Sequence, residues 1–136
     1  MSQRGTRITA VRTTAYTHSE SDHIQYGART AVGSQLKYGR VVRSAAADWS
    51  VYPVGTIFQI EGTPYIYQVD DYGSALVGTN TIDIYQPTRE HMNAWGVRKV
   101  NIRVLRWGSK SMSLAIMKDR QKYEHVRKMV QRIQRG

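Results

Sequence analysis

Apolar and polar residues alternate over most of the chain between Arg7 and about Gly108. This period of two is typical of β-strands with one buried face. Turn signals such as Gly62-Thr63-Pro64 separate the alternating runs, which cover residues 8–17, 41–49, 56–60, 65–69, 81–85 and 100–105. The pattern predicts a small closed barrel, because closure removes the exposed edges of an open sheet.

Two segments depart from this alternation and predict helices. Thr88 can cap a short helix that ends near Gly96, with Met92 and Trp95 on its buried face. A C-terminal amphipathic helix is predicted over about residues 118–135. Its apolar positions recur at helical spacing: Tyr123, Val126, Val130 and Ile133. The expected fold is therefore mainly β, with one short inserted helix and one helix at the C-terminal end.

Composition limits the organisation and the chemistry. A chain of 136 residues with 40% apolar content can form one core, so we expect a barrel over residues 1–109 and a helical extension over 110–136 packed on it. The absence of cysteine excludes disulfides, thiolate metal sites and thiol nucleophiles. No apolar run reaches the roughly 20 residues of a membrane helix, so no transmembrane segment is predicted.

The charge is strongly positive, with a net value of +10 and a pI near 10.2. Such a field attracts polyanions. Eight of the Lys and Arg residues lie in the 110–136 extension, against two acidic residues. Its basic face is either a solvated helix surface or a site for anionic envelope polymers. No specific nucleic-acid partner is predicted, because the aromatic and basic signatures of RNA-binding folds are missing.

The carboxylates suggest acid–base chemistry. Alternation in 81–85 places Ile82 and Ile84 on one face and Asp83 with Tyr85 on the other. Glycines between Asp71 and Asp83 can turn the chain so that the two carboxylates approach each other. One of two close carboxylates keeps its proton near neutral pH and can act as a general acid. Alternatively, Asp71 caps a turn and Asp83 accepts backbone hydrogen bonds.

Metal binding is disfavoured at the two places where ligands could be drawn. His18 and His23 fall in a polar, loop-like segment, where their spacing fixes no shared face. The aspartates, including Asp70, lack the ligand pattern of an EF-hand loop. We expect neither a metal nor another cofactor.

Five short motifs, in this order, resemble the 3D domain family, which is named for three aspartates. They are Ala47-Asp48-Trp49, Tyr52-Pro53-Val54-Gly55-Thr56, Asp71-Tyr72-Gly73, Ile82-Asp83-Ile84-Tyr85 and Trp95-Gly96-Val97-Arg98. The resemblance covers about residues 14–105. It implies a six-stranded double-psi β-barrel and, in catalytic members of the family, lytic transglycosylase activity on peptidoglycan.

The resemblance also assigns roles by position. Asp83 corresponds to the catalytic acid, Asp71 to a supporting carboxylate and Asp48 to the first aspartate of the same site. Tyr16 and Lys37 fall in segments that the resemblance places near the glycan groove.

The chain departs from the family pattern at two aromatic residues. Tyr72 stands where Thr is usual and Trp49 where Pro is usual; each either stacks on a sugar or only fills space. Backbone amides near Gly73 could stabilise developing charge.

The implied reaction needs one working carboxylate. Asp83 protonates the oxygen between N-acetylmuramic acid and N-acetylglucosamine, then takes the proton of the muramyl 6-hydroxyl, which closes a 1,6-anhydro ring. Peptidoglycan glycan strands are the implied substrate, and the bacterial cell envelope is the implied location, with a leader absent from this chain. The alternative is a non-catalytic module of the envelope that binds peptidoglycan or another glycan.

Overall fold

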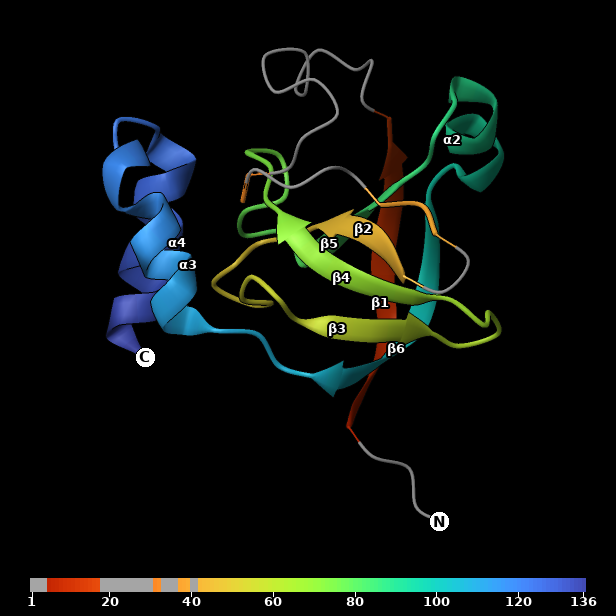
Figure 1. Cartoon of the computed structure of the whole chain (residues 1–136), viewed down its shortest axis with the longest axis horizontal. Coiled ribbons are helices and arrows are strands. Elements are labelled where there is room, and N and C mark those ends of the chain that lie inside the picture. Colours follow the sequence, from red (N-terminus) through yellow and green to blue (C-terminus); the bar gives the residue numbers. More distant parts are fainter. Residues whose placement is uncertain (1–4, 18–30, 33–36, 40–41) are drawn as a thin grey trace.

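The computed structural model describes residues 5–17, 31–32, 37–39 and 42–136. Six strands close into a barrel with the order β1-β5-β2-β4-β3-β6 (Figure 1). The strands are β1 (Thr6–Tyr16), β2 (Val42–Ala46), β3 (Ile57–Ile60), β4 (Ile66–Asp71), β5 (Thr81–Tyr85) and β6 (Arg98–Arg106). The pairs β1–β5 and β2–β4 are parallel, and the other four pairs are antiparallel. The predicted double-psi barrel is confirmed.

The barrel core follows the predicted alternation. Ile82 and Ile84 are fully buried in the main hydrophobic cluster, whereas Tyr85 belongs to a second cluster with Tyr16. One strand is shorter than predicted, because β2 ends at Ala46. Beyond it the chain turns, and the carbonyl oxygen of Asp48 accepts hydrogen bonds from two following backbone amides.

The short helix α2 (Arg89–Trp95) begins and ends as predicted. The Thr88 hydroxyl accepts a hydrogen bond from the backbone N–H of His91, and Gly96 follows with a φ of 64°. Met92 and Trp95 lie on the less exposed face of this helix, as predicted, but both are only half-buried, and Trp95 packs against the main hydrophobic cluster. This short helix packs against β1 at one edge, where the Trp95 indole N–H donates to the Thr13 hydroxyl.

The C-terminal extension contains more helix than predicted. In place of one helix from about residue 118, it forms α3 (Lys110–Met117), a 3-10 turn η1 (Lys118–Arg120) and α4 (Glu124–Arg135). Residues 121–123 interrupt the helical path before α4. The helix α3 was missed because Lys110–Met117 has no strong helical periodicity in its apolar positions.

The apolar stripe of α4 is largely as predicted. Val126, Val130 and Ile133 are buried, together with Met129, whereas Tyr123 precedes the helix and is 39% exposed. The buried residues belong to the same hydrophobic cluster as the barrel core. Figure 1 shows α3 and α4 together at one side of the barrel. The predicted division of the chain into a barrel (1–109) and an extension (110–136) stays a prediction. Residues of both segments belong to the same hydrophobic cluster. Within the described ranges, no helix has the length and apolar character needed to cross a membrane.

Candidate active site

Strand β4 contains a β-bulge at two consecutive aspartates, Asp70 and Asp71. Ala45 of β2 pairs with Val69, but the next residue, Ala46, pairs with Asp71, so Asp70 is the extra residue. On its other side, Ala46 pairs with Asp83 of β5. Asp71 and Asp83 therefore lie at one level of the barrel, two strand spacings apart, or about 10 Å between Cα atoms.

Asp71 is a buried carboxylate held by backbone amides. Its Oδ1 accepts hydrogen bonds from the N–H of Tyr72 at 2.9 Å and of Ala31 at 3.2 Å. Burial raises its pKa to about 7, and the negative charge of Asp70 adds to the rise. The two amide hydrogen bonds act in the opposite direction. Asp71 thus holds a proton in a substantial fraction of molecules near neutral pH.

Asp70 is a member of this cluster that the sequence prediction considered only as a metal ligand. Its Oδ2 accepts a 2.6 Å hydrogen bond from the Ser44 hydroxyl, whose oxygen accepts the backbone N–H of Lys37 at 2.7 Å. Burial raises the pKa of Asp70 to about 6, while Ser44 and the charge of Lys37 act against the rise. The only signal in the sequence was two adjacent acids at the end of a strand, because no residue pattern marked the bulge.

Asp83 is the most accessible of these carboxylates. It is half-buried, whereas Asp70 and Asp71 are both buried. The parallel register of β1 and β5 places Thr14 beside it, and the Thr14 hydroxyl donates to Asp83 Oδ1 at 2.7 Å. The threonine fixes one carboxylate oxygen.

Tyr16 is buried close to the three carboxylates. Its side chain is 1% exposed, and its ring centroid lies 5.6 Å from that of Tyr85. Burial raises its pKa well above the ordinary value, and the charges of Asp71, Asp70 and Asp83 raise it further. The phenol therefore lies among these carboxylates, at the buried side of the site.

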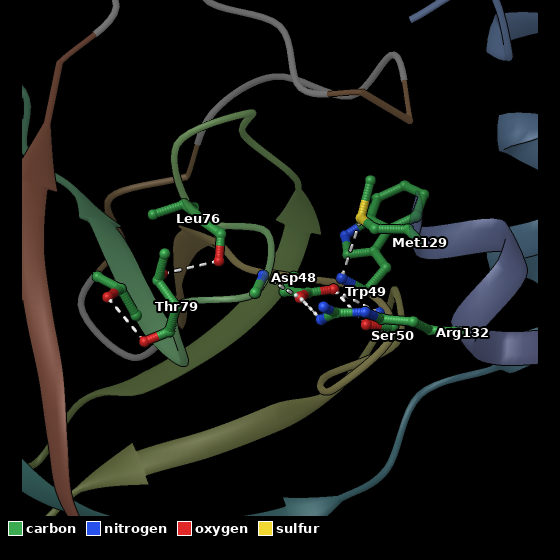
Figure 2. A network of polar contacts seen from close by, with 9 residues as sticks. Asp48, Trp49, Ser50, Leu76, Thr79, Met129 and Arg132 are labelled. Atoms are coloured by element: carbon green, nitrogen blue, oxygen red, sulfur yellow. Dashed lines mark hydrogen bonds and ion pairs between the residues drawn. The ribbon is translucent and has the colours of Figure 1, made fainter. Parts of the chain in front are cut away.

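Asp48 lies in a separate network (Figure 2). It is 1% exposed, and its oxygens accept hydrogen bonds from the N–H and hydroxyl of Ser50 and from the N–H of Gly78. Arg132 of α4 lies 3.6 Å from Asp48 Oδ2. The polar contacts of Asp48 with described residues include none of the other three aspartates.

The two aromatic departures from the family pattern have different surroundings. Trp49 is fully buried and donates its indole N–H to the carbonyl oxygen of Asp71 at 2.9 Å, so it fills space rather than offering a sugar-stacking face. Tyr72 and Gly73 are half-buried. The Tyr72 ring packs edge-on against Trp49, with 5.0 Å between ring centroids.

The described residues contain no group of three His, Cys, Asp or Glu side chains that could hold a metal ion. His18 and His23 lie outside the described residues.

The protein is therefore a closed six-stranded β-barrel protein that carries aspartates on β4 and β5. Residues 43–106 match the family model of the 3D domain. This segment, slightly less than half of the chain, matches the 3D domain family, as the motifs predicted.

Two curated proteins of Bacillus subtilis (strain 168) are similar in sequence. The candidate cell wall shaping protein YabE is 34% identical over 99 residues, which are 73% of this chain and 23% of YabE. The cell wall-binding protein YocH is 30% identical over 103 residues, which are 76% of this chain and 34% of YocH. The chain thus spans about a quarter to a third of these relatives.

Among solved structures, MltA from E. coli matches 59% of this chain and 28% of its own, at 26% identity and a TM-score of 0.46. The strand order of the barrel, and not this likeness, establishes the fold.

Proposed function

We propose that this chain is a lytic transglycosylase. It would cleave the bond between N-acetylmuramic acid and N-acetylglucosamine and form 1,6-anhydro-N-acetylmuramic acid. The observation that carries the proposal is the unequal exposure of the carboxylates, since a half-buried Asp83 lies at the same level of the barrel as a buried Asp71.

This inequality favours transglycosylation over hydrolysis. A glycoside hydrolase generally needs two carboxylates that reach opposite sides of the scissile bond. Asp71 is buried and bound to two backbone amides, so it cannot serve as the second working group without a rearrangement. A transglycosylase needs only Asp83, which first gives a proton to the leaving oxygen and then receives the proton of the 6-hydroxyl.

The other residues would support Asp83. The hydroxyl of Thr14 orients the carboxylate. Asp71, partly protonated near neutral pH, would limit the negative charge of the site when the substrate binds. Tyr72 and Gly73, which are half-buried, remain the candidates for contact with the glycan. Lys37 would act from further away, through Ser44 and Asp70.

The names of the relatives support the substrate and the location. YabE is named for cell wall shaping and YocH for cell wall binding. We therefore place the protein in the bacterial envelope, outside the cytoplasmic membrane, with peptidoglycan as its partner. Cations of the C-terminal extension would add attraction to anionic envelope polymers.

A glycan-binding module without turnover is the second candidate. The name of YocH, a cell wall-binding protein, favours it. Such a module would keep the barrel and hold glycan at the same face.

The test is the product formed from purified peptidoglycan sacculi. Anhydro-muropeptides, identified by mass, would support the transglycosylase, reducing-end products would indicate hydrolysis, and binding without products would indicate the module. Asp83→Asn keeps the shape of the side chain and an oxygen for Thr14, so we expect a folded protein with a rate about 10²- to 10⁴-fold lower. Asp119→Asn, on η1, is the matched control. A rate for Asp83→Asn above about a tenth of wild type would contradict the assignment.

A further inference from the structure

The loop of residues 72–80 joins the strand of Asp71 to the strand of Asp83, so its position bears on both carboxylates. Its Leu76 is buried in the cluster that contains Tyr16 and Tyr85. The loop is fixed internally by hydrogen bonds from the N–H and the hydroxyl of Thr79 to the carbonyl oxygen of Leu76 (Figure 2). The loop therefore packs, through Leu76, against Tyr16, whose pKa the charges of Asp71, Asp70 and Asp83 raise.

Asp48 ties the far end of this loop to the barrel. Its Oδ2 accepts the N–H of Gly78 at 2.9 Å. Gly78 has a φ of +82°, which L side chains rarely adopt, and a Cβ there would lie 3.4 Å from Arg132 Nη2. The backbone of the loop thus meets both Asp48 and Arg132.

Arg132 provides the charge that opposes the buried Asp48. The carboxylate is 1% exposed, whereas the side chain of Arg132 is 49% exposed, and Nη1 lies 3.6 Å from the same oxygen that accepts Gly78. Hydrogen bonds and an opposite charge offset the cost of burying a carboxylate. Ser50 and Gly78 donate the hydrogen bonds to Asp48, and Arg132 supplies the opposite charge.

The C-terminal extension also contacts the near end of the loop. Arg120 of η1 donates to the Tyr72 hydroxyl at 3.4 Å, and the ring centroid of His125 lies 5.7 Å from that of Tyr72. On the barrel side, the N–H of Trp49 donates to the sulfur of Met129 at 3.4 Å. Residues of η1 and α4 therefore meet both ends of the loop, at Tyr72 and at Gly78.

We propose that Arg132 is a positioning residue that acts through Asp48 to hold the 72–80 loop, which joins the strand of Asp71 to the strand of Asp83. The extension is then part of the site, not only an anchor for anionic polymers. The kinetic consequence of this inference rests on the proposed function, whereas its structural consequence does not.

Hydrogen exchange of the loop tests the structural part. In the full chain, Arg132→Gln should speed exchange of the amides in 73–80 about two- to fivefold, as expected for loss of a partly exposed ion pair. Arg132→Lys should restore part of the protection. Arg135→Gln, a charge-matched change on the same helix, should leave the exchange of the loop unchanged. Amides of β3 serve as the internal reference.

Two results would overturn the inference. One is unchanged exchange of the loop in Arg132→Gln, and the other is an equal increase in the loop and in β3, which would indicate general destabilisation. In a glycan-cleavage assay, Arg132→Gln should lower kcat more than Arg135→Gln does. Absence of cleavage by the wild type would contradict the proposed function alone, because the exchange experiment does not depend on turnover.

Discussion

Replacing Asp71 by Asn should stabilise the protein at neutral pH while removing a carboxyl group from the site. The amide keeps the shape of the side chain and an oxygen for the N–H groups of Tyr72 and Ala31. It removes a charge that burial disfavours. The variant should therefore lack one source of the pH dependence of folding.

The direction follows from the protonation of both states. Below about pH 3.8, the ordinary pKa, Asp71 is protonated in the folded and the unfolded chain, and it costs nothing. Between that value and the folded pKa of about 7, the unfolded chain releases the proton more readily, so stability falls as pH rises. Above about 7 the loss is complete.

The difference between the ordinary pKa of 3.8 and the folded pKa of about 7 sets the size of the stability change. At 1.36 kcal/mol for each pH unit, it amounts to about 4 kcal/mol, which is an upper limit because Asp70 and Asp71 interact. At pH 8 the variant should thus be more stable than wild type by up to about 4 kcal/mol, which is several degrees or more in Tm. At pH 3 to 4 the two proteins should be nearly equal.

The assay is urea unfolding of both proteins at several pH values from 4 to 8. The difference between them reports Asp71 together with its interaction with Asp70, since the remaining titratable groups are common to both proteins. A difference that stays constant over this range would refute the argument that Asp71 carries the raised pKa.

Two further predictions concern the Trp49 contact and the basic extension. Trp49→Phe should lower the free energy of unfolding by about 1–3 kcal/mol in urea unfolding, because the carbonyl oxygen of Asp71 loses its indole donor and keeps only the N–H of Ala47, and because the smaller ring leaves a void in the core; a loss below about 0.5 kcal/mol would contradict this role. Replacing Lys122, Lys128 and Arg135 by Gln should flatten the decrease in sacculus binding as salt rises, because exposed charges are screened over about 10 Å at 0.1 M salt. A salt dependence equal to that of wild type, measured by co-sedimentation, would show that these cations are not the attachment.

The sequence by itself determined the barrel and the positions of its strands. Alternation is a local property, and it separated the two faces of β5, with Ile84 in the main core and Asp83 on the other face, where Tyr85 is buried in a second cluster. The cap at Thr88 was equally visible, because a hydroxyl, the amide it accepts and a terminal glycine lie within a few residues of each other. The match of residues 43–106 to the 3D domain could also be predicted, because each of its motifs is a short run of neighbouring residues.

Only the tertiary structure decided which carboxylates meet and what holds them. The bulge leaves Asp70 as the extra residue of β4 and pairs Asp71 with Ala46. It depends on the register of β2 against β4, which no residue pattern records. The separate network of Asp48 depends on Arg132, which follows it by more than 80 residues and reaches it only because α4 packs at that side of the barrel. Periodicity predicts which face of a helix is buried, but the partner of each charge is fixed by contacts between segments that are distant in the chain.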